Sequence, residues 1–148
     1  MKDYGPPLER PYQCFMGRWE GLCKTMTAAG DLIHSAAVHM DVHWLDETTW
    51  HLHEDFDDLY EVGPMIFDTA ITVDGKRCSA TSEAIDIEGT ELTANNYVFT
   101  LDSRVTKTLV YNNHYFLDRD TRRIITHKVR GGKTHIFQIQ DFVRTVRP

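Results

Sequence analysis

Two neighbouring segments of the chain, residues 38–44 and 50–56, carry imidazole or carboxylate groups at every second position. These residues are His39, Asp41 and His43 in the first segment and His51, His53 and Asp55 in the second. If the segments pair as adjacent β-strands, facing side chains lie about 4.5–5.5 Å apart at Cβ, so two histidines could share a zinc, copper or nickel ion. The candidate metal ligands are therefore His39, His43, His51 and His53, with Asp41 as a third ligand or an orienting group.

The alternate positions of these two segments are apolar and include a single carboxyl group, Glu54. Matching the apolar faces places Trp44 opposite Trp50, Val42 opposite Leu52, and Met40 opposite Glu54, because a one-residue slip would exchange the two faces. The histidine face is then expected on the solvated outside, and no metal is favoured. Apolar neighbours would raise the pKa of Glu54 and suit it to general acid or base catalysis. The alternative is that Glu54 lies at the open end of a barrel, exposed or paired with an arginine.

A second group of candidates combines aromatic rings with polar groups. Tyr97, Phe99 and Leu101 share one strand face, and Tyr111, Asn113 and Tyr115 share another. Such rings suit a flat, oxygenated ligand, and His114 could act as an acid or base, or bind haem iron if it points inward. Ordinary core aromatics with a turn at Asn112-Asn113 are the alternative. The candidate catalytic residues are Glu54, His114, Tyr97 and Tyr111, and the candidate ligand-binding residues are Met40, Trp44, Trp50, Leu52, Phe56, Phe99 and Tyr115.

A run of basic side chains follows towards the C-terminus. It comprises Arg119, Arg122, Arg123, Lys128, Arg130 and Lys133. These residues could bind a carboxylate or phosphate of a ligand, but a solvated face of the last hairpins is favoured.

The elements that position these residues are predicted to be almost entirely β-strands. Short apolar/polar alternations are separated by turn signals such as Asp74-Gly75 and Gly131-Gly132, which indicates an antiparallel sandwich or barrel. The expected strands are 18–29, 32–44, 50–58, 65–73, 76–84, 91–101, 104–113, 114–118, 122–130 and 133–146. Before them, one or two helical turns are expected between Pro11 and Gly17. The 148 residues suit one domain, an N-terminal segment 1–16 followed by a barrel over 17–148.

Composition excludes several functional classes. A net charge of −6 argues against a sequence-independent nucleic-acid binder, and no apolar run approaches the roughly 20 residues that span a membrane. The first residues lack the apolar stretch of a signal peptide, so none is expected, and the three widely spaced cysteines predict no disulfide framework; together these features favour the cytoplasm. The motifs of nucleophile-elbow hydrolases, zincins, P-loop NTPases and Rossmann oxidoreductases are missing.

The segment Gly17-Arg18-Trp19, placed on the first strand of a meander, resembles the calycin superfamily of lipocalins, fatty-acid-binding proteins and nitrobindin-like barrels. The resemblance implies that Gly17 permits close approach at the closed end of the barrel and that Trp19 plugs this end. It also implies that an arginine of a late strand packs across the Trp19 ring, for which Arg144, Arg147 and Arg123 are candidates. A nitrobindin-like haem pocket would use one histidine as iron ligand, but that motif matches no residue here.

A barrel of about eight to ten strands leaves room for one small ligand, so an apolar or aromatic metabolite is expected in the lumen. We favour a cofactor-independent lyase, isomerase or cyclase that uses acid/base residues there. The alternatives are a non-catalytic carrier or sensor of a lipid, pigment or haem, and a histidine-rich metal-dependent enzyme. If Trp19 points inward, Leu22 and Met26 point outward, where a second copy of the chain is a candidate to cover them.

Overall fold

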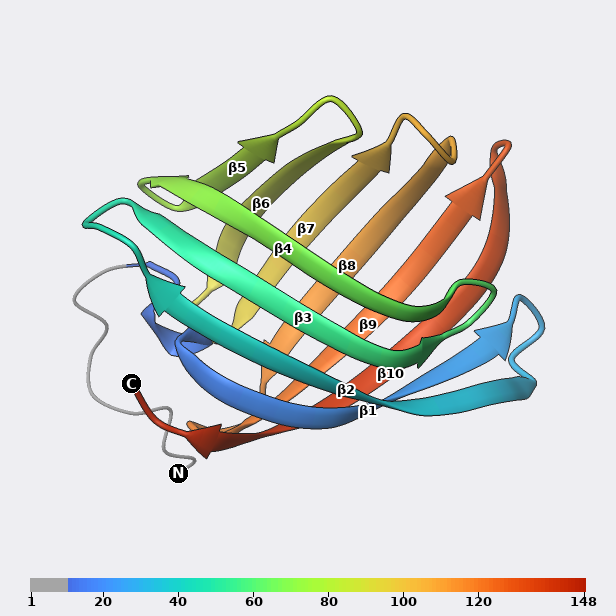
Figure 1. Cartoon of the computed structure of the whole chain (residues 1–148), viewed down its shortest axis with the longest axis horizontal. Coiled ribbons are helices and arrows are strands. Elements are labelled where there is room, and N and C mark those ends of the chain that lie inside the picture. The colour runs from blue at the N-terminus through green and yellow to red at the C-terminus, as the bar shows by residue number, and fades with distance from the viewer. Residues whose placement is uncertain (1–10) are drawn as a thin grey trace.

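The computed structural model describes residues 11–148, which form a closed antiparallel barrel of ten strands (Figure 1). The strands are β1 (Gly17–Thr27), β2 (Leu32–Trp44), β3 (Thr49–Leu59), β4 (Gly63–Asp74), β5 (Arg77–Thr81), β6 (Ile85–Thr93), β7 (Asn96–Ser103), β8 (Thr108–Phe116), β9 (Thr121–Arg130) and β10 (Lys133–Val146). Each strand pairs with its neighbours in sequence, and β10 returns to pair with β1 and close the barrel. The predicted all-β meander is confirmed.

The segment before the barrel is less helical than expected. It contains a single 3₁₀ turn, η1 (Gln13–Phe15), beside the start of β1 (Figure 1). The predicted helical turns between Pro11 and Gly17 therefore reduce to this one turn, because Met16 already has extended backbone angles that lead into β1. The rest of the predicted N-terminal segment, residues 1–10, lies outside the described residues.

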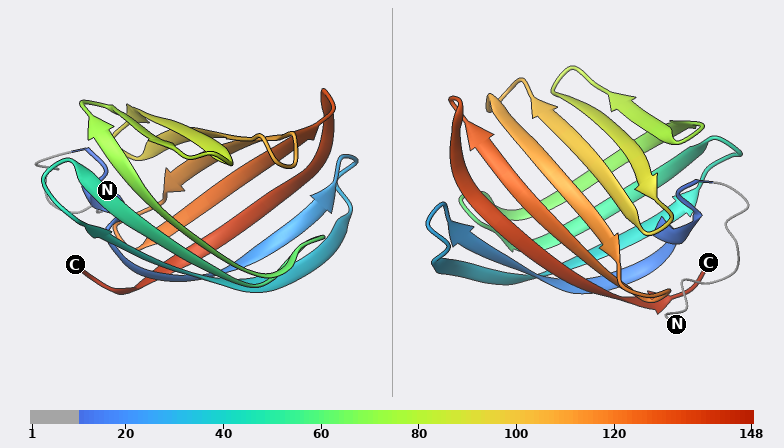
Figure 2. Two further views of the ribbon diagram at one scale, coloured as in Figure 1. Left: turned by 45° about the horizontal axis from the view of Figure 1, so that its top comes forward. Right: turned by 180° about the vertical axis from the view of Figure 1, so that it is seen from behind.

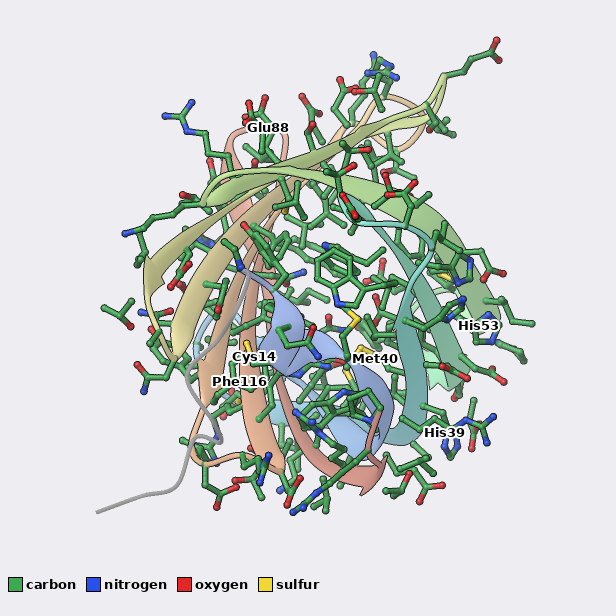
Figure 3. The ribbon with its side chains drawn as sticks, turned by 90° about the vertical axis from the view of Figure 1, so that its left-hand side faces the viewer. Cys14, His39, Met40, His53, Glu88 and Phe116 are labelled. Atoms are coloured by element: carbon green, nitrogen blue, oxygen red, sulfur yellow. The ribbon has the colours of Figure 1, made fainter. Side chains whose placement is uncertain are left out.

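The β2–β3 hairpin has the register that its alternating pattern predicts. Trp44 faces Trp50, Val42 faces Leu52 and Met40 faces Glu54, while His43 faces His51 on the other side. Figure 3 shows Met40 inside the barrel and His39 and His53 on its outer surface. The apolar face therefore lines the interior, as the hydrophobic pattern requires.

The boundaries between residues 85 and 118 differ from the prediction. The expected strand 91–101 is interrupted at residues 94–95, where a turn joins β6 to β7, and the strand over Ile85–Thr93 was not predicted. The expected turn at Asn112-Asn113 is wrong, because both residues pair regularly with β7 and β9 inside the single strand β8. Asparagine carries a turn preference, but here the ladder on both sides overrides it.

The shortest strand pairing of the barrel is between β4 and β5, where three residue pairs join Thr72–Asp74 to Arg77–Ser79. The strands form two curved layers around the interior, seen from three directions in Figures 1 and 2. The β3–β4 and β9–β10 connections both lie at the end opposite η1 (Figure 1). No helix among residues 11–148 has the length and apolar character needed to cross a membrane.

Candidate functional site

The closed end of the barrel is built around Trp19, whose indole is fully buried and donates from Nε1 to the Phe15 carbonyl at 2.9 Å. The guanidinium groups of Arg144 and Arg122 lie 4.5 and 4.4 Å from its ring centroid, within the range of cation–π attraction. Gly17 is required here, since it has φ +116° and a Cβ would lie 2.5 Å from the Val146 carbonyl oxygen. The calycin-like plug is therefore present, with two arginines rather than one.

The three arginine candidates for this plug behave differently. Arg144 packs on Trp19, as expected of one of them. Arg123 instead pairs with Asp141, and Arg147 pairs with Asp120, both on the outer surface. Arg122, the second arginine on the indole, was assigned to the basic run rather than to the plug.

Aromatic side chains form a floor between this plug and the lumen. Phe15 lies at its centre, with ring centroids at 4.9 Å from Tyr97, 5.1 Å from Phe116 and 5.6 Å from Trp50. These contacts are tilted or edge-on for Tyr97 and Phe116, the arrangement that aromatic quadrupoles favour. The floor is a rigid, well-packed base for whatever lies above it.

Above the floor lies a deep chamber of about 50 Å³. Its apolar lining includes Phe15, Met40, Trp50, Leu52, Phe67, Ile71, Ile87, Phe99, Leu101 and Ile124, and its polar lining is Glu54, Asn112, His114, Arg122 and Gln140. Glu54 projects into it from β3 and is partly buried. Burial raises the pKa of Glu54 to about 7, although the positive charge of Arg122 and then His53 oppose the shift.

Four residues that line the deep chamber hold a buried polar atom without a hydrogen-bond partner among residues 11–148. They are Trp50 (Nε1), His114 (Nδ1), Arg122 (Nε) and Gln140 (Oε1). Native proteins pair nearly all such atoms, because each unpaired one costs about 1–3 kcal/mol. Four in one chamber therefore mark a place where a polar group of another molecule would be stabilised.

Arg122 gives this chamber its charge. Its side chain is 1% exposed; Nη2 lies 3.6 Å from the Met40 sulfur, and the guanidinium also packs on aromatic rings. Burial lowers the pKa of Arg122, yet a guanidinium stays protonated in proteins. Burial, followed by the charge of Arg122, holds the pKa of His114 well below its usual value, so this imidazole is neutral.

A larger cavity of about 420 Å³ continues from the chamber towards the open end and shares five lining residues with it, Glu54, Phe67, Leu101, Asn112 and Gln140. Its two sides differ. The β3–β7 side is mostly apolar, with Phe56, Met65, Phe67, Ile85 and Leu101, whereas the β8–β10 side carries Asn112, Thr126, Lys128, Gln138 and Gln140. Such a lumen can hold a molecule with one apolar edge and one polar edge.

Polar side chains cross the mouth of this cavity. Glu61, in the β3–β4 turn, accepts from His135 at 2.9 Å and lies 3.5 Å from Arg130 Nη1, so it ties this turn to the β9–β10 hairpin. Arg130 Nε also lies 3.4 Å from the Thr108 hydroxyl. Unlike the polar atoms of the deep chamber, these groups find partners within the protein.

The structure brings together some of the predicted site residues and separates others. Glu54, His114, Met40, Trp50, Leu52 and Phe99 line the deep chamber, and Phe56 lines the larger cavity. Tyr97 points inward but is sealed within the aromatic floor, where its hydroxyl accepts from Cys14 Sγ at 3.3 Å. Trp44 lies beside η1 and donates to Gln13 Oε1.

Tyr111 and Tyr115 were expected to line the lumen and do not. β8 is regular throughout, so Asn112 and His114 face inward and the two tyrosines face outward. Tyr111 is 41% exposed, and its ring lies 6.0 Å from that of His127 on the outer surface. The expectation failed because the side of β8 that faces the core was not fixed by its sequence.

The histidine face is on the outer surface, as favoured, and its imidazoles pair with different carboxylates. His51 and His53 lie 3.3 and 2.8 Å from Asp68, and His43 lies 3.9 Å from Asp41. His39 is near Glu20 and Asp57. Within residues 11–148 no three such groups converge on a position suited to a metal ion.

Sequence analysis missed several lining residues, chiefly Arg122, Lys128, Asn112 and Gln140. The charged ones were assigned to a solvated face because β9 carries cations on both faces: Arg122 and Lys128 point inward, and Arg123 points outward. One signal for these two residues was available in the sequence. Arg122, Ile124, Thr126 and Lys128 occupy every second position of β9, so their side chains share one face of the strand.

No family model matches the chain, and no curated protein matches it in sequence. Solved structures with similar barrels include the S-type phycobiliprotein lyase CPES from Guillardia theta, at 12% identity and a TM-score of 0.66 over 89% of both chains. A protein of unknown function from the DUF3598 family of Nostoc punctiforme matches at 12% identity and a TM-score of 0.74, and this chain covers 95% of its own length but 52% of that chain. Rv2717c from M. tuberculosis matches at 10% identity and a TM-score of 0.65 over 89% of this chain and 93% of that one. At such identities the likeness concerns the fold, and the chain has a calycin-like β-barrel.

Proposed function

We propose that the barrel binds a small, largely apolar or aromatic molecule in its lumen, with one polar group in the deep chamber. The observation that carries the proposal is the set of four unpaired polar atoms around this chamber. A ligand group that paired with them would remove an unfavourable term from the free protein, and the apolar wall would bury the rest of the molecule. The calycin-like fold, shared with a protein named a phycobiliprotein lyase, agrees with this use of the lumen.

We further propose that Glu54 acts on the ligand as a general acid or base, in a lyase, isomerase or cyclase reaction that needs no cofactor. A carboxyl group whose pKa lies near 7 exchanges protons readily at neutral pH. His114, held neutral beside it, can donate or accept one hydrogen bond. The surrounding apolar side chains exclude water from the reacting group.

A non-catalytic carrier or sensor is the second candidate function. It is favoured by the packing of His114 between Phe15 and Phe99, at ring distances of 5.3 and 4.9 Å, which restrains its movement. Haem is a poor fit for this position, since the chamber of about 50 Å³ beside His114 holds only a few water-sized groups. A flat macrocycle would have to displace Phe15 or Phe99 to reach the imidazole.

Binding in the lumen is tested with N-phenyl-1-naphthylamine, an uncharged fluorophore, and two adjacent substitutions on β7. Leu101 lines both cavities, so Leu101→Trp fills the lumen, whereas Thr100→Trp adds the same bulk to a separate pocket of about 510 Å³ that shares no lining residue with either cavity except Phe99. We expect the first variant to lose binding at least tenfold and the second to match the wild type. Equal binding by all three proteins would reject the lumen as the site.

The natural ligand is sought in untagged protein from its own host, by absorption spectroscopy and native mass spectrometry. A co-purified mass identifies the class of ligand. Catalysis is then tested by comparing wild-type protein with Glu54→Gln on that compound. The amide keeps the shape but cannot transfer the proton, so turnover should fall about 10²–10⁴-fold; full turnover would leave the carrier as the function.

A further inference from the structure

Lys128 is a cation inside the barrel that the protein does not pair. It points inward from β9, lines the larger cavity, and is partly buried there. Within residues 11–148 its ammonium group makes no hydrogen bond or ion pair. Burial lowers its pKa against the opposing effect of Cys23; of the smaller effects, the charge of Arg130 lowers it and that of Glu61 raises it. Lysines removed from solvent are normally paired, because an uncompensated charge is costly to bury.

The carboxylate of the mouth, Glu61, acts on Lys128 only weakly and without forming an ion pair with it among residues 11–148. Arg130 and His135 already share the single carboxylate of Glu61. The ionisable residues around the larger cavity thus include two cations, Lys128 and Arg130, against Glu61 at the mouth and Glu54, whose pKa burial raises to about 7. This end of the lumen therefore favours an anionic group.

The closed end favours a different group. Trp50 Nε1–H and Arg122 Nε–H are donors, whereas Gln140 Oε1 is an acceptor, and all three are unpaired. A carboxylate has no donor for Gln140 and would meet the carboxyl group of Glu54. An uncharged group with both donor and acceptor, such as a lactam, an amide or a hydroxyl, satisfies both kinds of atom.

β9 sets the distance between the two ends. Arg122 at the closed end and Lys128 near the mouth are six residues apart on the same face of this strand. At about 3.3 Å per residue they are separated by about 20 Å along the strand. Between them Ile124 and Thr126 offer no charge.

We propose that the ligand is an elongated amphipathic anion, bound with its uncharged hydrogen-bonding end in the deep chamber and its anionic oxygen group on Lys128 and Arg130 at the mouth. This inference rests on the proposed function and adds the ligand class and its orientation. The opposite orientation would place the anion on Arg122, leave Gln140 unpaired, and leave Lys128 without a counter-ion.

The test uses cis-parinaric acid, a fluorescent polyene acid, and its methyl ester, which has the same body without the charge. Wild-type protein should bind the acid about tenfold more tightly than the ester, and Lys128→Gln should abolish this preference by weakening the acid alone. Lys128→Arg should retain it, because the guanidinium keeps the charge. Lys133→Gln is the matched control, since Lys133 belongs to the same basic run but is exposed and does not line the cavity.

Three outcomes would overturn the inference. Equal binding of acid and ester by the wild type would show that no anion site exists. A preference that survives Lys128→Gln and disappears in Arg122→Gln would place the anion at the closed end. Failure of both polyenes to bind, while N-phenyl-1-naphthylamine still binds, would reject the elongated class and leave the lumen site standing; failure of all three probes would reject the proposed function as well.

Discussion

The two ends of the lumen handle polar groups in opposite ways. At the closed end, Trp50, Arg122 and Gln140 hold buried polar atoms that no group in the described part of the chain pairs, inside a tightly packed aromatic shell. At the mouth, Glu61, Arg130 and His135 are partly exposed and pair with one another. The closed end is therefore preorganised for a ligand group, whereas the mouth is held together by contacts that water and a ligand can replace.

The two ends therefore contribute differently to ligand binding and to folding stability. Unpaired donors in a rigid site lose little additional freedom when a ligand binds, so their pairing contributes directly to affinity. Exposed ion pairs contribute about 0–1 kcal/mol to folding and can be exchanged at small cost. We therefore expect substitutions at the closed end to lower the free energy of unfolding more than substitutions at the mouth.

The largest contrast is expected between Trp19→Ala and Tyr60→Ala. Trp19 is fully buried and supports both arginines of the plug, so its loss should lower the free energy of unfolding by about 3–5 kcal/mol. Tyr60 lines the mouth and is partly exposed, so its loss should cost about 1 kcal/mol. Urea denaturation of the two variants measures both values, and similar costs would show that the mouth is packed as firmly as the closed end.

The second contrast concerns pH and Glu54. The unfolded carboxyl group ionises near pH 4.5 and the folded one near pH 7, so between these values the unfolded state loses its proton first. Stability is thus present at low pH and falls by up to about 3 kcal/mol as pH rises through 7. Glu54→Gln removes this loss, so the variant should gain on the wild type progressively from pH 4.5 to pH 8.

The difference between these two proteins isolates Glu54 from the other titrating groups. His114 has a lowered pKa, so it makes both proteins less stable as pH falls, and this contribution cancels. A difference that stays constant from pH 4.5 to pH 8 would contradict the burial of an ionisable group at this position.

The sequence predicts the β2–β3 part of the site well, because only one strand register fits the pattern of apolar and polar residues there. Within residues 38–44 and 50–56 every inward residue except Glu54 is apolar, and every outward residue is charged or an imidazole, so only one register buries the apolar face. Glu54 could be singled out for the same reason. The apolar face also determines which residues, Met40 and Trp50 among them, reach the lumen.

The polar side of the lumen could not be predicted in this way. β8 alternates Asn112 and His114 with Tyr111 and Tyr115, and either set could face a core. β9 carries cations on both faces, so alternation does not reveal that Arg122 is buried. The inward face of these strands is set by the pairing of β1 with β10, which closes the barrel, and by the aromatic floor. Contacts in this region join residues up to 130 positions apart, such as Cys14 and Arg144.

A smaller effect sharpens the description of the closed end. The charge of Arg122 lowers the pKa of Glu54 against the larger effect of burial. Arg122→Met removes that charge and keeps an apolar side chain of similar length, so the pKa of Glu54 should rise above 7. Carbon NMR of the labelled carboxyl group follows this titration, and an unchanged pKa would mean that the two groups do not interact.

The smallest effect on stability is expected at the mouth, from Glu61→Gln. This change removes the negative charge shared by Arg130 and His135, both partly exposed, and should alter the free energy of unfolding by less than about 1 kcal/mol. If the mouth binds an anion, the same change frees Arg130 for it, so cis-parinaric acid should bind several-fold more tightly while its methyl ester is unaffected. Weaker binding of the acid would instead show that Glu61 positions Arg130 for the ligand. The two ends would then both be preorganised, and the contrast between a rigid closed end and an exchangeable mouth would be lost.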